Sequence, residues 1–129
     1  MSATILIVED NADTRSAYAD YLRWCGYLIR EAENGRDALA SIEANEPDLV
    51  LLDLALPIVD GWEVARRLRA HPRHARLPIV VVTAHSLFGD ERRIRQSGCD
   101  AFLTKPCDPD RLVATIAGLL TGTAGVPGR

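Results

Sequence analysis

One carboxylate stands inside the most apolar stretch of the chain. Asp53 follows the strand-forming run Leu49–Leu52 and precedes the apolar residues Leu54–Leu56. An isolated ionised carboxylate is very costly in an apolar interior. We therefore expect Asp53 to lie where its strand emerges from the sheet, within reach of a counter-charge, and not deep in the core.

Four further polar side chains stand at the ends of predicted strands. Glu9 and Asp10 follow the first strand, Thr83 ends the fourth, and Lys105 follows the fifth. In an open parallel α/β sheet, binding sites form beyond the carboxyl ends of the strands. Three acids, one hydroxyl and one lysine should therefore converge on one edge of the sheet.

The charges of this cluster indicate a metal ion and a dianionic ligand. Two carboxylates ~4 Å apart repel by about 1–4 kcal/mol, depending on the effective dielectric constant. A hard divalent cation would offset this repulsion, and carboxylates with water suit Mg²⁺, with Mn²⁺ as a substitute. Lys105 can pair with a dianion, and Thr83 can donate a hydrogen bond to it. With Asp53 as nucleophile, these are the parts needed for phosphoryl transfer.

The elements that must position these side chains are short apolar runs that alternate with amphipathic stretches. Three runs, in "TILIV", "DLVLLD" and "PIVVVT", are nearly continuous, as in strands buried on both faces of a parallel sheet. The expected strands are Thr4–Val8, Tyr27–Ala32, Leu49–Asp53, Pro78–Thr83 and Ala101–Thr104. This order predicts an α/β protein of the (βα)5 type, with a doubly wound five-stranded parallel sheet.

Helical periodicity follows each predicted strand. Apolar stripes predict four clear helices, at about residues 18–25, 38–42, 64–68 and 112–120. The remaining helix, around Gly89–Ser97, has little apolar surface beyond Leu87 and Ile94, so we expect it to lie lightly on the sheet with its charges in solvent. Asn11 or Asp13 suits the N-cap of the first helix.

Length and composition indicate one ordinary globular domain. The chain has 129 residues and a net charge of −3, which favours neither nucleic acid nor membrane as a partner. No apolar run approaches the roughly 18 residues of a transmembrane helix, and "MSATILIVED" lacks the basic region of a signal peptide. We expect the domain to span residues 1–120, with residues 121–129 as a flexible tail or the start of a linker.

The cysteines favour a reducing compartment. Cys25, Cys99 and Cys107 are odd in number and lack CxxC or metal-type spacing, so a disulfide framework is not expected. The prediction is a cytoplasmic protein.

Four segments together resemble the receiver domain of response regulators, in the two-component and chemotaxis-regulator-like group. They are "VED" (Val8–Asp10), "LLDLALPIVDG" (Leu51–Gly61), "VVVTAH" (Val80–His85) and "FLTKP" (Phe102–Pro106). The similarity covers about residues 4–120. It implies a flavodoxin-like sheet with strand order 2-1-3-4-5, and regulation by aspartyl phosphorylation in a two-component system or phosphorelay.

The resemblance also implies a role for each matching residue. Asp53 is the phosphoacceptor, and Thr83 and Lys105 contact the phosphoryl group. Further residues would bind Mg²⁺ or flank the phosphoryl site. Asp10 and Asp53 bind Mg²⁺ directly, with the backbone carbonyl of Ala55, and Glu9 helps mostly through water; Ala84 and His85 flank the phosphoryl group, Phe102 is the switch aromatic, and the bond before Pro106 is cis.

The implied function is a signalling switch. A histidine kinase or a histidine phosphotransfer protein would donate the phosphoryl group. The surface of helix 4, strand 5 and helix 5 would then change and control a downstream protein, with a phosphorylation-dependent homodimer through that surface. Catalysis would be limited to the protein's own phosphorylation and dephosphorylation, so the chain is not expected to be an enzyme in the usual sense.

Three positions depart from the common pattern of this family. Ala55 has no polar group to orient an attacking water, and His85 is bulky, polar and titratable. Leu56 stands where methionine is frequent, a change that conserves volume. The first two positions bear on the lifetime of the phosphorylated state.

Two other functions are compatible with parts of the sequence. A receiver-like interaction module that never uses phosphate would keep the fold, but it would not need Asp53, Thr83 and Lys105. A metal-dependent phosphatase of the haloacid-dehalogenase type would need a second acid where Ala55 stands. Neither GxxxxGK[ST] nor GxGxxG is present, which argues against nucleotide binding.

Each singled-out residue also has a plain structural interpretation. Asp53 could be a turn residue, Thr83 a β-branched strand residue and Phe102 a core residue. The segment His71–His74 ("HPRH") has the residue types of a metal site, but it follows the third helix, away from the acids, so solvated histidines are the better prediction.

Overall fold

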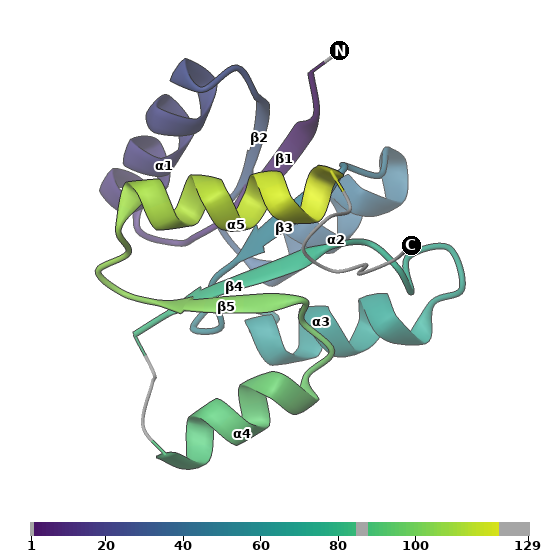
Figure 1. Cartoon of the computed structure of the whole chain (residues 1–129). Coiled ribbons are helices and arrows are strands. Elements are labelled where there is room, and N and C mark those ends of the chain that lie inside the picture. Colours follow the sequence, from purple (N-terminus) through teal and green to yellow (C-terminus); the bar gives the residue numbers. More distant parts are fainter. Residues whose placement is uncertain (1, 85–87, 122–129) are drawn as a thin grey trace.

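The computed structural model describes residues 2–84 and 88–121, with the side chains of all of these except 88–90. Within them, strands and helices alternate along the chain (Figure 1). The strands are β1 (Thr4–Val8), β2 (Leu28–Ala32), β3 (Leu49–Leu52), β4 (Ile79–Thr83) and β5 (Ala101–Thr104). The helices are α1 (Ala12–Trp24), α2 (Gly35–Ala44), α3 (Gly61–Ala70), α4 (Phe88–Gln96) and α5 (Pro109–Thr121).

The five strands form one parallel sheet in the order β2-β1-β3-β4-β5, which confirms the predicted topology. Three strands differ from the predicted bounds by one residue at one end. The register aligns Val8 of β1 with Leu52 of β3, so the next residues, Glu9 and Asp53, leave the sheet side by side. In the same way, Thr83 of β4 pairs with Thr104 of β5, next to Lys105.

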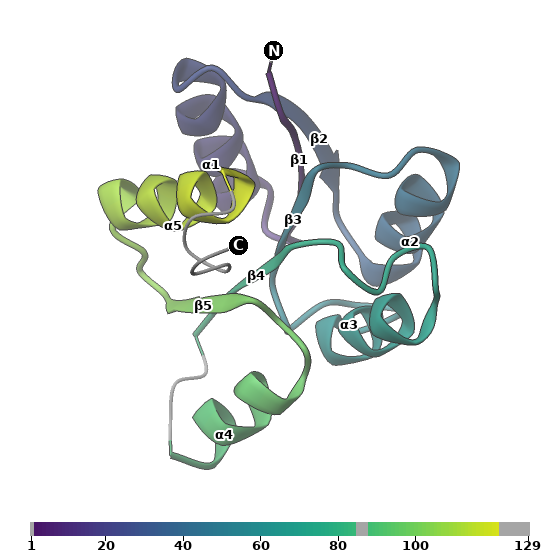
Figure 2. The same cartoon turned by 45° about the vertical axis from the view of Figure 1, so that its right-hand side comes forward.

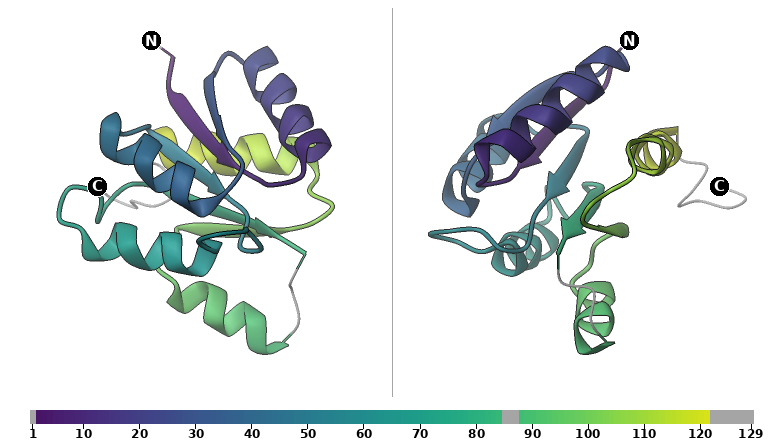
Figure 3. Two further views of the ribbon diagram at one scale, coloured as in Figure 1. Left: turned by 180° about the vertical axis from the view of Figure 1, so that it is seen from behind. Right: turned by 90° about the vertical axis from the view of Figure 1, so that its left-hand side faces the viewer.

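Helices cover both faces of the sheet. Figures 2 and 3 show α1 and α5 on one face and α2, α3 and α4 on the other. Successive residues of a strand point to opposite faces, so Leu6 and Val8 pack with α2 and α3, while Ile5 and Ile7 pack with α1 and α5. The three central strands are almost entirely buried, which explains their continuous apolar runs.

Two helices test the finer predictions. Helix α4 buries Ile94 completely, whereas its residues 91–93 and 95–96 are exposed, so the predicted light packing is confirmed for the described side chains. At the start of α1, the Oδ1 atom of Asn11 accepts a hydrogen bond of 2.9 Å from the backbone N–H of Thr14, which identifies Asn11 as the N-cap.

Some predictions fall on residues 85–87 and 122–129, which lie outside the described part of the chain. They concern His85, Leu87 and the predicted tail. Among the described helices, none combines the length and the apolar character needed to cross a membrane.

Candidate functional site

The predicted acids and the lysine meet beyond the carboxyl ends of β1, β3 and β5. The Nζ atom of Lys105 lies 2.6 Å from Oε1 of Glu9 and 2.9 Å from Oδ2 of Asp53. Glu9 and Asp53 are only 2% and 6% exposed, so their charges need this partner. Lys105 is the single lysine of the chain.

Backbone N–H groups hold the second oxygen of each buried carboxylate. The N–H of Ala55 donates to Oδ1 of Asp53 at 3.1 Å, and the N–H of Asn11 donates to Oε2 of Glu9 at 3.0 Å. Each carboxylate is therefore bonded on both oxygens, and its orientation toward the sheet edge is set by the loop that follows its own strand.

The carboxylates also act on the ionisation of the lysine. Burial acts to lower the pKa of Lys105, but the hydrogen bonds and charges of Glu9 and Asp53 outweigh it, and the pKa is raised above its ordinary value. The lysine is therefore cationic at neutral pH. In its present position it neutralises part of the charge of the two carboxylates.

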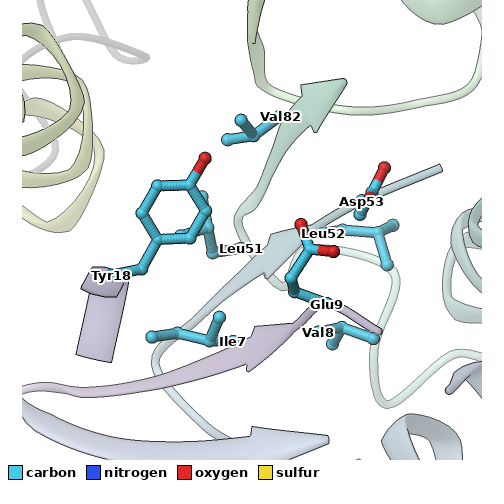
Figure 4. Close-up of a pocket in the computed structure, with 8 residues that line it drawn as sticks. All are labelled: Ile7, Val8, Glu9, Tyr18, Leu51, Leu52, Asp53 and Val82. Atoms are coloured by element: carbon cyan, nitrogen blue, oxygen red, sulfur yellow. The ribbon is translucent and has the colours of Figure 1, made fainter. Parts of the chain in front are cut away.

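A small pocket lies beside this pair (Figure 4). Glu9 and Asp53 border it with apolar side chains of β1, β3 and β4, and Tyr18 closes it from α1. Burial raises the pKa of the Tyr18 phenol, although the positive charge of Lys105 opposes this effect. The Tyr18 side chain is therefore uncharged at neutral pH and borders the charged groups of Glu9 and Asp53.

Three acids are placed to hold a cation. Carboxylate oxygens of Glu9, Asp10 and Asp53 lie within 4.8 Å of one another, and Asp10 is exposed to solvent. An all-oxygen set open to water on one side matches the ligand preference of Mg²⁺. The donor atoms present thus fit the metal that the sequence predicts.

The remaining predicted residues surround the cluster. Thr83 is completely buried, and its carbonyl accepts a hydrogen bond of 2.9 Å from the N–H of Lys105. The bond between Lys105 and Pro106 is cis, as expected. Ala55, two residues after Asp53, and Ala84, directly after Thr83, are both exposed. Phe102 is half-buried against the core, with the guanidinium carbon of Arg95 5.1 Å from its ring centre.

Two residues that the sequence did not single out contribute to the site. Arg15 donates from Nη1 to the backbone carbonyl of Glu9 at 2.8 Å and pairs through Nε with Glu31 at 3.1 Å, so it links β1 to β2. Tyr18 lines the pocket, although its place in an apolar helical stripe suggested only a core role. Both lie on α1, on the turns that follow the acidic pair.

The prediction of solvated histidines in His71–His74 is wrong for one of the two. His74 is only 3% exposed, because the loop after α3 folds back against the end of α2. Its Nδ1 atom lies 2.6 Å from Oε2 of Glu46. Carboxylate partners from the end of α2 and the loop that follows it make this burial possible, and the sequence around His74 carries no sign of them.

The fold and the acid cluster define a class of protein: a doubly wound, flavodoxin-like α/β domain with an acidic site at the carboxyl edge of its sheet. The sequence profile of the response regulator receiver domain matches residues 5–117. The chain therefore belongs to the response regulator receiver family of two-component signalling.

Individual relatives agree with this assignment. The polar-differentiation response regulator DivK of Brucella anthropi is 38% identical over 120 residues, which cover 93% of this chain and 98% of DivK. The receiver domain of a signal transduction histidine kinase from Syntrophus aciditrophicus has a TM-score of 0.89 and 32% identity, with 95% of this chain and 93% of that chain covered.

A third relative was solved with its metal. The receiver domain of the sensor histidine kinase PA1611 from Pseudomonas aeruginosa carries a magnesium ion coordinated in its active-site cleft. It has a TM-score of 0.87 and 31% identity, with 94% of this chain and 99% of that chain covered.

Proposed function

We propose that this receiver domain accepts a phosphoryl group on Asp53 from a phosphohistidine and thereby switches the surface it offers to a partner. The observation that carries the proposal is the meeting of Asp53 with Glu9, Asp10 and Lys105 at one edge of the sheet. A domain that served only as a scaffold would have no need to assemble two buried carboxylates around one lysine.

The proposed transfer is a single displacement at phosphorus. A carboxylate oxygen of Asp53 forms the new P–O bond while the P–N bond of the phosphohistidine breaks, and the imidazole leaves with the electron pair of that bond. The Nζ atom of Lys105 is already 2.9 Å from Oδ2 of Asp53. It can therefore stabilise the negative charge that develops on the phosphoryl oxygens during transfer. The hydroxyl of Thr83 then donates a hydrogen bond to the phosphoryl group.

Asp10, Asp53 and the carbonyl of Ala55 would hold Mg²⁺ directly, with Glu9 acting mostly through water; Mn²⁺ would substitute. When bound, the metal supplies positive charge to the phosphoryl oxygens. Glu9 keeps its bonds to Asn11 and Lys105 and fixes the end of β1 beside the reacting carboxylate.

The switch would pass through β5. Engagement of Thr83 by the phosphoryl group leaves space behind β4, and Phe102 turns into it from its half-buried position. This movement releases the contact of Phe102 with Arg95 of α4, so the surface of α4, β5 and α5 shifts between two populations. Ala84 and Pro106 border the strand ends that move.

We propose a cytoplasmic histidine kinase or histidine phosphotransfer protein as donor, and a downstream protein or a second copy of the domain as the partner of the α4–β5–α5 surface. The chemistry of the domain itself would be limited to its own phosphorylation and dephosphorylation. Ala55, exposed and without a polar side chain, and His85 would set how long the phosphate lasts.

The test is phosphorylation by a small acyl phosphate with Mg²⁺, followed by intact-mass spectrometry. We expect one phosphoryl group on the wild-type protein and none on Asp53→Asn. Asp60→Asn is a matched control, because Asp60 is an exposed aspartate of the same loop whose Oδ1 caps α3 at 2.9 Å, a role that asparagine also fills.

Stoichiometric phosphate on Asp53→Asn would refute the assignment of the phosphoacceptor. A wild-type protein that takes up no phosphate, and whose Trp62 fluorescence does not respond to millimolar Mg²⁺, would instead favour the receiver-like interaction module.

A further inference from the structure

A second cluster of metal-binding side chains lies at the other end of α3. His71 caps the C-terminus of α3, and His74 follows it in the loop that leads to β4. Glu43 belongs to the last turn of α2, and Glu46 follows in the loop to β3. One potential ligand atom from each of Glu43, His71 and His74 lies within 4.8 Å of the others.

The buried histidine is held between two carboxylates. Its Nδ1 atom lies 2.6 Å from Oε2 of Glu46, and its Nε2 atom lies 3.4 Å from Oε2 of Glu43. If the neutral imidazole of His74 carries its proton on Nδ1 and donates it to Glu46, the lone pair of Nε2 faces the carboxylate of Glu43. Two acceptors that face each other need a cation between them, either a proton on Nε2 or a metal ion.

The distances suit a tetrahedral metal. Ligand atoms about 2.0–2.1 Å from Zn²⁺ are roughly 3.3 Å apart in a tetrahedron, close to the 3.4 Å between His74 and Glu43. The ring of His71 is 4.8 Å from that of His74, centre to centre. Glu43 and His71 are exposed, so their side chains can close the remaining distance while solvent fills the fourth position.

The contact of Glu46 with Nδ1 adds a second, independent feature. Histidine ligands almost always donate their other ring N–H to a carboxylate, a carbonyl or water, which fixes the ring and raises its basicity. Glu46 stands in that relation to His74. Arg73 competes with a metal for two of the ligands. Its Nη1 atom lies 3.3 Å from Oε1 of Glu43, and its backbone N–H donates to Nδ1 of His71 at 3.1 Å.

We propose that Glu43, His71 and His74 form a Zn²⁺ site that joins the end of α2 to the loop after α3, with Glu46 as a positioning residue. Two imidazoles and one carboxylate favour Zn²⁺, whereas the all-oxygen set at Asp53 favours Mg²⁺. The ten residues of α3 separate the two sites by about 15 Å along the helix axis. Zinc here would tie α2 to α3 without occupying the phosphoacceptor.

The experiment is a Zn²⁺ titration of the full chain against a chromophoric chelator, in excess Mg²⁺ so that the acids around Asp53 are occupied. We expect one Zn²⁺ per chain. His71→Ala should weaken binding at least tenfold and remain folded, because His71 is exposed. Glu46→Gln should weaken it by about 10–100-fold. Glu91→Gln, which removes an exposed carboxylate of α4, should leave the affinity unchanged.

Two further measurements keep the outcome decisive. Zn²⁺ should raise the melting temperature of the wild-type protein more than that of His71→Ala. Co²⁺ in place of Zn²⁺ should give the absorption of a tetrahedral nitrogen and oxygen site. Equal affinities of wild type and His71→Ala, absence of Zn²⁺ binding at micromolar concentration, or a thiolate charge-transfer band from cysteine would each overturn the proposal.

Discussion

Lys105 has two tasks at the residue scale. In the structure it offsets part of the negative charge of Glu9 and Asp53, whose side chains are almost completely buried. In the proposed reaction the same ammonium group pairs with the negatively charged phosphoryl oxygens. The first task explains why the site can exist before any ligand binds, since two buried carboxylates without a counter-charge would destabilise the fold.

Lys105→Met should therefore destabilise the protein in the absence of divalent ions. Breaking a buried ion pair costs about 3–5 kcal/mol, and the partial exposure of the lysine reduces the expected loss in unfolding free energy to roughly 2 kcal/mol. Urea unfolding measures the loss. Mg²⁺ should restore part of it, because the metal replaces the missing positive charge; an unchanged midpoint in metal-free buffer would contradict this role.

The same pair gives a pH dependence with a definite sign. The pKa of Lys105 is raised in the folded protein, so its contribution is fully present below the unfolded value of 10.5 and is lost as the pH rises through the folded value. The stability difference between wild type and Lys105→Met should therefore shrink at alkaline pH.

At the scale of elements, Gly61, the first residue of α3, packs directly against the backbone of Asp53 and Leu54. The N–H of Gly61 donates to the carbonyl of Leu54 at 2.9 Å. A Cβ atom at Gly61 would lie 2.3 Å from the carbonyl oxygen of Asp53 and 2.5 Å from Cα of Leu54. Glycine thus lets the helix approach the loop that carries the phosphoacceptor.

Gly61→Ala should push this loop away from α3. Because the contact is with backbone, it cannot relax by a side-chain rotation, and we expect a loss of about 2 kcal/mol or more in unfolding free energy. Mg²⁺ affinity, measured by Trp62 fluorescence, should fall as well, since the carbonyl of Ala55 belongs to the displaced loop. Wild-type affinity for Mg²⁺ in this variant would show that the loop tolerates the shift.

A contrasting change lies in the same loop. Ile58 is 65% exposed and has a φ of 71°, a conformation that is strained for a β-branched residue. Ile58→Asn should raise the unfolding free energy by about 1 kcal/mol, because asparagine tolerates this region and little buried surface is lost. The two variants together separate backbone strain from steric contact.

At the scale of the whole molecule, the two apolar clusters share a single sheet. Cys99 packs against the cluster under α2, α3 and α4, and Cys107 packs against the one under α1 and α5. Burial raises the pKa of both thiols. Cys25 is exposed at the end of α1.

Thiol alkylation with increasing urea should therefore report on both faces at once. Cys25 is exposed and should react fastest in the native state, whereas the partly buried Cys99 and Cys107 should react more slowly. Both should become fully reactive at the same urea concentration, because neither face keeps its core once the shared strands separate. Mass spectrometry of the labelled peptides measures each site. Different midpoints for Cys99 and Cys107 would show that the faces unfold independently.

The sequence was sufficient to predict the fold and the meeting of Glu9, Asp53 and Lys105 at one edge of the sheet. Continuous apolar runs such as Leu49–Leu52 identify strands that are covered on both faces, and in a parallel sheet the residue after each run must emerge at the same edge. This rule placed Asp53 beside Glu9 and Lys105, although 96 residues separate Glu9 from Lys105.

The contacts that depend on how one helix end meets another were decided only by the tertiary structure. The burial of His74 between Glu43 and Glu46 follows from the packing of the loop after α3 against the end of α2, some 30 residues away. Periodicity determines which face of an element is apolar and at which edge its ends emerge. It does not determine which polar side chains of two loops come within bonding distance, because that depends on the packing of the whole core.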